Sequence, residues 1–120
     1  MTEHTLTAAD LLQFTGTENW YRHPLFPRCT YTDGVRHVAQ AGGAWWLVEA
    51  ILSHQADPKA RREAFQHWKL TVTPDHSATL TMDDGNENVV IVQKIGFTDF
   101  PLPEVGFYLT DTVLMLPGEY

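Results

Sequence analysis

The stretch HWKLTVTPDHSATLTM, residues 67–82, decides the fold. Trp68, Leu70 and Val72 alternate with polar side chains, and residues 78–82 repeat this alternation. A period of two is typical of strands that bury one face. Residues 74–77, Pro-Asp-His-Ser, favour a turn between the two strands. The stretch therefore predicts an antiparallel hairpin with one apolar face.

Further strands are expected downstream of this hairpin. After a second turn segment, residues 83–87, the run over residues 89–95 is apolar on both faces, which predicts a strand at the centre of the sheet. Residues 97–103 contain two prolines and should run extended outside the sheet. Residues 105–109 and 113–116 predict a last hairpin.

The pattern upstream of residue 67 is helical. Capping residues and apolar side chains one turn apart predict helices over residues 7–16, 34–41, 45–52 and 59–66. Residues 17–28 carry Pro24 and Pro27 and should form an ordered loop. A short strand is expected over residues 28–32.

These elements predict an α+β fold in a single domain, residues 1–120. We expect N-terminal helices, about residues 7–66, packed on one face of a C-terminal four- to five-stranded antiparallel meander sheet, about residues 67–117. With 120 residues and 43% apolar side chains, the chain is long enough to close one core.

The charge balance argues against general nucleic-acid binding. Eight Lys and Arg against fifteen Asp and Glu give a net charge of −7. Residues 71–120 hold the whole acidic excess, with Lys94 as their single base. Cys29 is the single cysteine, so an internal disulfide is excluded, and we expect a cytoplasmic protein that does not enter a membrane.

The densest group of large amphipathic side chains runs from Trp20 to His23. Rings beside a guanidinium can bind a planar or anionic group. The alternative is that Trp20 and Tyr21 fill the gap between the first helix and the sheet. The candidate binding residues are Trp20, Tyr21, Arg22, His23, Tyr31, Asp33 and Trp46, with Trp45 as the alternative to Trp46.

Catalytic chemistry has weaker support. His23, Cys29, Asp33 and His37 are residue types found in metal and nucleophile sites, but their spacing matches no known signature. The acidic segment 83–87 does not have the spacing of a calcium loop and is expected to be a plain turn. We therefore predict no catalytic residue, no metal and no cofactor.

Five blocks of the sequence carry a resemblance to a known family. They are FTGTENWYRH (residues 14–23), YTDGV (31–35), WKLTV (68–72), FTDFPL (97–102) and LPGEY (116–120). Together they resemble a family of small bacterial proteins known only as a domain of unknown function, over nearly the whole chain. The resemblance implies a compact bacterial protein, often of accessory or mobile-element type, and implies no reaction.

Three functional hypotheses follow. The first is a non-enzymatic binding protein with an unidentified protein partner. The second is an inhibitor of a defence nuclease, of anti-CRISPR or anti-restriction type, acting through an acidic surface of Asp83, Asp84, Glu87 and Asp99. The third is a small-ligand or hydrolytic pocket that pairs Asp33 with His37 or His23. A monomer or a homodimer is expected, the latter through the apolar residues 113–116.

Overall fold

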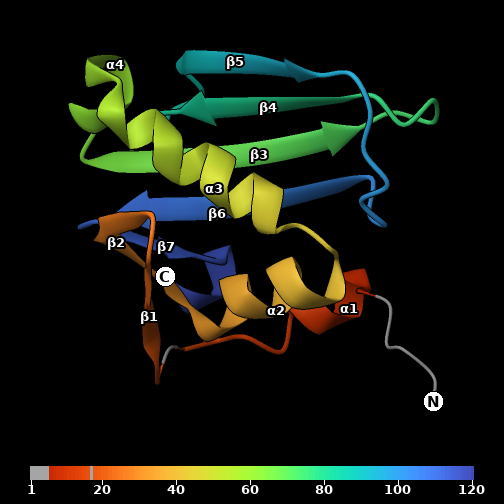
Figure 1. Cartoon of the computed structure of the whole chain (residues 1–120), viewed down its shortest axis with the longest axis horizontal. Coiled ribbons are helices and arrows are strands. Elements are labelled where there is room, and N and C mark those ends of the chain that lie inside the picture. The colour runs from red at the N-terminus through yellow and green to blue at the C-terminus, as the bar shows by residue number, and fades with distance from the viewer. Residues whose placement is uncertain (1–5, 17) are drawn as a thin grey trace.

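The computed structural model describes residues 6–16 and 18–120, in which helices pack around one mixed sheet (Figure 1). The strands are β1 (Trp20–His23), β2 (Phe26–Thr32), β3 (Phe65–Val72), β4 (Ala78–Asp83), β5 (Val89–Ile95), β6 (Glu104–Thr110) and β7 (Val113–Met115). The helices are α1 (Ala8–Leu11), α2 (Asp33–Ala41), α3 (Trp45–Ser53) and α4 (Pro58–Arg61), with 3₁₀ turns η1 (His54–Ala56) and η2 (Pro117–Glu119). None of these helices is long and apolar enough to cross a membrane.

The α+β class is confirmed, but the predicted sheet has too few strands and lacks the parallel pair. The sheet has seven strands in the order β1-β2-β7-β6-β3-β4-β5. The hairpins β3–β4, β4–β5 and β6–β7 are antiparallel as expected, whereas β2 pairs with β7 in parallel. A meander built only from the C-terminal half is therefore wrong, because the segment assigned to the helical layer supplies two strands.

The strand expected over residues 28–32 is confirmed as β2, whereas β1 and the start of β2 lie in the segment whose prolines predicted a loop. Pro24 lies in the turn between the strands, and Pro27 lies at the start of β2. The parallel contact with β7 begins only at Thr30, so neither proline interrupts it. Proline is tolerated at such positions because no ladder hydrogen bond is required of its nitrogen.

The prediction that residues 89–95 form the central strand is wrong. This segment is β5, at the edge of the sheet, with Val89 58% and Val92 56% exposed. Strands β6 and β3 occupy the interior of the order instead. An apolar run on both faces indicates a strand, but it does not distinguish an interior strand from an edge strand.

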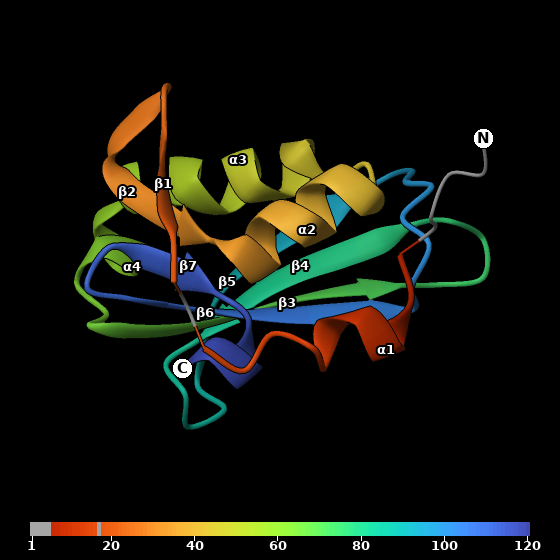
Figure 2. The ribbon, with the colours of Figure 1, turned by 90° about the horizontal axis from the view of Figure 1, so that it is seen from below.

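Helices cover mainly one face of the sheet (Figure 2). Helices α2 and α3 lie on that face, which we call the helix face, while α1 and η2 lie on the other, the open face. The expectation that all N-terminal helices share one face is therefore wrong for α1. Two helices are also shorter than predicted: α1 ends at Leu11, and α4 ends at Arg61 because the chain turns there into β3.

The core forms where the predicted alternation meets α3. Trp68, Leu70, Leu80 and Phe107 point to the helix face and are fully buried. The indole Nε1 of Trp68 donates to Oε1 of Gln66 at 2.8 Å, so the one polar atom of this ring is paired inside the core. From α3, the core receives Leu47, Val48, Ile51 and Leu52.

A buried carboxylate fixes the C-terminal turn η2 to the start of α2. Glu119 accepts hydrogen bonds from the Thr32 hydroxyl at 2.6 Å and the Gly34 backbone N–H at 3.1 Å. It also accepts one from the Leu116 N–H at 3.0 Å. The space is so tight that a Cβ on Gly34 would lie 2.4 Å from Oε1 of Glu119.

The apolar terminal hairpin is partly covered within the chain. Strand β7 lies between β2 and β6, and Leu114 and Leu116 are 0% and 1% exposed. Leu114 and Leu116 are therefore covered within the chain, whereas Val113 and Met115 are half-buried, and a homodimer through residues 113–116 stays a prediction.

Candidate functional site

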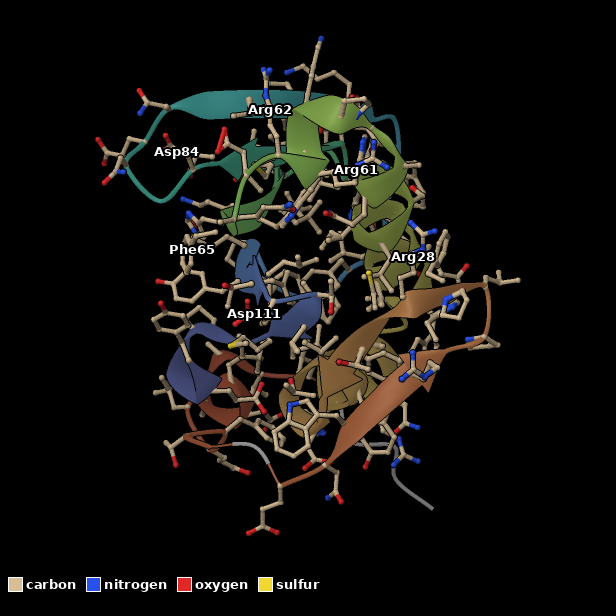
Figure 3. The ribbon with its side chains drawn as sticks, turned by 90° about the vertical axis from the view of Figure 1, so that its left-hand side faces the viewer. Arg28, Arg61, Arg62, Phe65, Asp84 and Asp111 are labelled. Atoms are coloured by element: carbon tan, nitrogen blue, oxygen red, sulfur yellow. The ribbon has the colours of Figure 1, made fainter. Side chains whose placement is uncertain are left out.

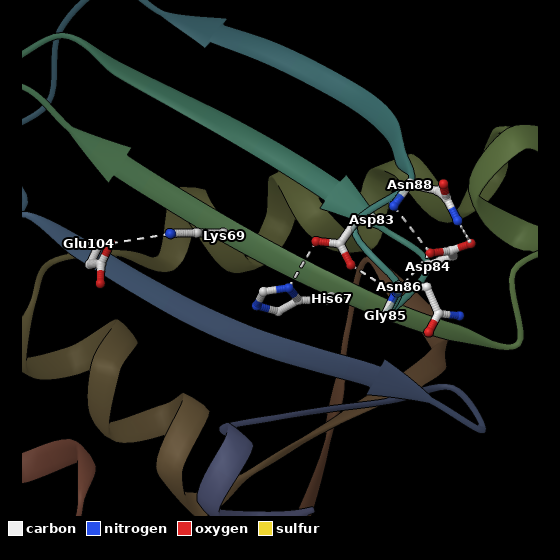
Figure 4. A network of polar contacts seen from close by, with 8 residues as sticks. All are labelled: His67, Lys69, Asp83, Asp84, Gly85, Asn86, Asn88 and Glu104. Atoms are coloured by element: carbon white, nitrogen blue, oxygen red, sulfur yellow. Dashed lines mark hydrogen bonds and ion pairs between the residues drawn. The ribbon is translucent and has the colours of Figure 1, made fainter.

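The open face brings together side chains that the sequence analysis did not select. Strand register aligns Tyr108 of β6, His67 of β3 and Asp83 of β4 in one row. Nδ1 of His67 lies 2.9 Å from Oδ2 of Asp83, and the His67 and Tyr108 rings meet edge to face with centroids 5.5 Å apart. Figure 4 shows the His67–Asp83 pair beside the β4–β5 turn. Alternation turns all three away from the apolar core.

Three aromatic rings form a cluster at the end of this row. The ring centroids of Phe65 and Tyr108 are 4.9 Å apart, those of Phe65 and Tyr120 are 5.4 Å apart, and those of Tyr108 and Tyr120 are 5.5 Å apart. Tyr120 meets both other rings edge to face and is 72% exposed. We call Phe65, Tyr108 and Tyr120 the aromatic cluster. A tyrosine that exposed offers apolar surface to a partner as well as to its neighbours.

The β4–β5 turn holds its acids in fixed positions (Figure 4). Asp83 accepts from the Gly85 N–H at 2.7 Å, and Asp84 accepts from the Asn86 N–H and the Asn88 amide at 2.9 Å each. The side-chain hydrogen bond from Asn88, followed by the backbone bond from Asn86, lowers the pKa of Asp84 below its usual value. The Asp84 carboxylate is therefore ionised at neutral pH.

A cavity of about 420 Å³ lies between the cluster and this turn, lined by Phe65, His67, Asp84, Gly85, Asn86, Tyr108 and Tyr120. Gly85 has φ of 91°, and a Cβ there would lie 2.9 Å from Phe65, so glycine gives the turn both its shape and its close approach to the ring. A second cavity of about 480 Å³ shares His67 and continues along the open face toward α1.

The predicted binding residues divide between the two faces of the β1–β2 hairpin. On the helix face, Tyr21 stacks on Tyr31 with centroids 5.5 Å apart, and its hydroxyl donates to Asp33 at 2.7 Å. Tyr31 also meets Trp45 edge to face at 5.5 Å, and the Arg36 guanidinium lies 4.8 Å from the Tyr21 ring centroid. These side chains contact one another and join the hairpin to α2 and α3.

The other predicted residues lie apart from that group. Trp20 and Arg22 alternate to the opposite face, where Trp20 is 57% exposed and Arg22 donates to the Pro27 carbonyl. His23 is buried, accepts from the Leu25 N–H and lies 3.4 Å from Glu49. Trp46 is half-buried against the core. The seven residues therefore do not form one continuous exposed surface.

Asp33 and His37, the proposed acid–base pair, line one open cavity of about 750 Å³. Hydrogen bonds, first from Tyr21 and then from Asn19, lower the pKa of Asp33. Nε2 of His37 lies 3.5 Å from Asp10. Asp33 and His37 therefore share one cavity, but an Asp33 held ionised by its neighbours is a poor proton donor.

The possible thiolate or metal site depends on Cys29 and on the residues around it. Cys29 is 5% exposed, and burial raises the pKa of its thiol, which keeps it protonated at neutral pH. Over residues 6–16 and 18–120, no three His, Cys, Asp or Glu side chains gather closely enough to hold a metal ion.

The predicted acidic surface is divided between two ends of the sheet. Asp83, Asp84 and Glu87 lie at the β4–β5 turn. Asp99 follows β5 at the opposite end, where the Thr98 N–H donates to the His76 carbonyl at 2.7 Å. Three of the four acids therefore form one group.

Sequence reasoning missed the aromatic cluster because its members come from three separate segments. One local signal was available for Tyr108, which alternation over residues 105–109 assigns to the solvent face, whereas Phe65 fell within the helix predicted over residues 59–66. Aromatic side chains on that face mark a candidate binding surface.

In comparison with known proteins, the model of a family of unknown function, DUF6876, matches residues 5–120. Neither the curated proteins nor the solved structures contain a significant match.

Proposed function

The chain belongs to DUF6876, a family of unknown function, and from that premise we propose that it is a non-enzymatic binding protein that receives a lysine or arginine side chain of a protein partner on its open face. The observation that carries this proposal is the 420 Å³ cavity, which is lined both by the Asp84 carboxylate and by three aromatic rings. We call this cavity, with the aromatic cluster and Asp84, the cation site.

The chemistry of the cation site favours a positive group with an aliphatic stem. A cation over an aromatic face gains about 0.5–2 kcal/mol, depending on how far it is desolvated. Asp84 adds a fixed negative charge, because its turn hydrogen bonds keep the carboxylate ionised and oriented. Lysine and arginine combine such a head with methylene groups that pack on rings.

The field of the whole chain supports the same type of partner. The net charge is −7, which attracts basic surfaces over a distance of about a Debye length, roughly 8–10 Å at moderate salt. Binding should therefore weaken as salt is added, and most of that change should appear in the association rate.

The test uses tetralysine as the probe, with acetylated tetralysine as its uncharged counterpart, in NMR titrations that follow the ring protons of Tyr108 and Tyr120. Asp84→Asn removes the charge but keeps an oxygen for the turn hydrogen bonds. Asp75→Asn is the matched control, because Asp75 is also a turn acid that accepts hydrogen bonds within its own turn, and it lies at the β3–β4 end of the sheet. We expect Asp84→Asn to weaken tetralysine binding about fivefold or more and Asp75→Asn less than twofold. Equal effects of the two variants would refute the cation site.

The hairpin surface of Trp20, Tyr21, Arg22, His23, Tyr31, Asp33 and Trp46 is the alternative location for the partner. A second pair of variants separates the two surfaces: Tyr120→Ala removes an exposed ring of the cation site, and Trp20→Ala removes an exposed ring of the hairpin. Loss of binding in Trp20→Ala with normal binding in Tyr120→Ala would move the partner to the hairpin.

Inhibition of a defence nuclease is the second candidate, favoured by the grouping of Asp83, Asp84 and Glu87 at one end of the sheet. In that case a DNA duplex should compete with this protein for the nuclease. Removing the charge of Glu87 should then weaken binding to the nuclease as much as removing the charge of Asp84. The cation site predicts a smaller effect at Glu87, which does not line the cavity.

A further inference from the structure

A second cleft opens at the same end of the molecule, on the side of the helices, and unlike the cation site it is lined by two arginines. Two neighbouring cavities meet there, of about 330 Å³ and about 290 Å³. Both are lined by Arg28, Cys29, Gln55 and Arg61. Figure 3 shows Arg28 on β2 and Arg61 on α4 beside this cleft, with Arg62 farther along toward β5.

Arg28 and Arg61 share the smaller cavity with two acids, Glu63 and Asp111. Across residues 6–16 and 18–120, neither guanidinium takes part in an ion pair or hydrogen bond. Both arginines are exposed, and both line the two cavities. A guanidinium group can bind a carboxylate through two parallel hydrogen bonds.

The larger cavity, which we call the apolar cavity, differs in its lining from the smaller one. Its walls are mainly Leu25, Phe26, Pro27, Leu52 and Ala56. The smaller cavity contains Glu63 and Asp111, whose carboxylates repel an anion. A ligand with a carboxylate at the arginines is therefore expected to extend its remaining atoms into the apolar cavity and away from the acids.

We propose that this cleft binds a medium-chain alkyl carboxylate, with the carboxylate between Arg28 and Arg61 and the chain in the apolar cavity. A volume of about 330 Å³ lies at the small end of the range for small-molecule sites, which suits a chain of modest length. The apolar walls stabilise the chain by burial, and the arginines select the charged head. This site is independent of the cation site.

Isothermal titration calorimetry with three probes separates the contribution of the carboxylate from that of the alkyl chain. Octanoate carries both groups, 1-octanol carries the alkyl chain without the carboxylate, and acetate carries the carboxylate without the chain. We expect octanoate to bind saturably with one molecule per chain. Octanol should bind at least about tenfold more weakly, and acetate should give no measurable heat. Octanol binding as tightly as octanoate would overturn the proposal, because the arginines would then contribute nothing.

Variants test the same point from the protein side. Arg28→Gln and Arg61→Gln each remove one charge and should each weaken octanoate binding about tenfold. Arg62→Gln is the matched control, because Arg62 is also an exposed arginine but lines neither cavity. Ala56→Leu fills the apolar cavity and should abolish binding. Thermal unfolding of each variant checks that it is folded, and equal binding by all four folded variants would overturn the proposal.

The single cysteine gives an independent readout. Cys29 is 5% exposed and lines both cavities, so a bound chain should hinder small thiol reagents. Modification of Cys29 by methyl methanethiosulfonate is followed by intact mass. Octanoate should slow this reaction in the unmodified protein but not in the double variant Arg28→Gln/Arg61→Gln. An unchanged rate at saturating octanoate would place the ligand elsewhere.

Discussion

Replacing Glu119 by alanine should destabilise the protein by about 3–6 kcal/mol. The change removes the acceptor for the Thr32 hydroxyl and for the Gly34 and Leu116 N–H groups, all of which are buried. Each buried donor left unpaired costs about 1–3 kcal/mol, and water reaching part of the space lowers the sum. Against a usual stability of about 5–15 kcal/mol, this is a large loss.

The sharper form of this prediction is a double-mutant cycle with Gly34→Ala. The added Cβ would lie 2.4 Å from Oε1 of Glu119, so the alanine alone should cost about 1–3 kcal/mol by displacing the carboxylate. Once Glu119→Ala has removed the carboxylate, the same alanine meets less obstruction. The double variant should therefore be more stable than the sum of the single changes predicts, by at least about 1 kcal/mol.

Urea denaturation followed by tryptophan fluorescence measures all three variants. Glu104→Ala is the control, because Glu104 is an exposed carboxylate that pairs with Lys69 at 3.3 Å and should contribute less than about 1 kcal/mol. Additive costs in the cycle, or a Glu119→Ala loss no larger than that of the control, would refute the described role of the carboxylate.

Three further predictions concern other contacts. The Thr73 hydroxyl and then Ser77 lower the pKa of Asp75 to about 2, so its stabilising effect is complete above about pH 4 and is lost as the pH falls toward 2; the acid limb of a stability curve should be shallower in Asp75→Asn. Gly118→Ser should lower the melting temperature by several degrees, because a Cβ there would lie 2.6 Å from the Phe14 carbonyl, and an unchanged melting temperature in calorimetry would contradict this contact. Gly85→Ala should reduce tetralysine affinity more than global stability, since it strains the turn at φ 91° and displaces Phe65; NMR titration and urea denaturation of the same sample separate the two effects.

Local periodicity predicted elements well where one face of a strand is buried. Residues 68–72 and 78–82 alternate because their apolar side chains are buried on the helix face while the side chains between them lie on the open face. These residues form β3 and β4 as expected. The same reasoning failed for residues 89–95, because hydrophobicity on both faces does not report the position of a strand within a sheet. That position depends on which strands pair across long separations in sequence, as Phe65 with Thr110 does.

The candidate sites were harder to predict than the elements. The cation site is assembled from Phe65, Asp84, Tyr108 and Tyr120, which no local spacing links. In the cleft, Arg28 of β2 and Arg61 of α4 line the same cavities, although no local spacing links them. The Trp20–His23 group was noticed because it is contiguous, yet alternation along β1 divides it between two faces.

The parallel pairing of β2 with β7 has a consequence for how the chain folds during synthesis. Thr30 pairs with Val113 and Tyr31 with Leu114, so the first hairpin cannot pair with β7 until residues 113 and 114 have left the ribosome. Contacts this distant in sequence slow folding. The hairpin must wait with an unpaired edge, and a chain that stalls before residue 113 would expose a strand ready to join with another copy.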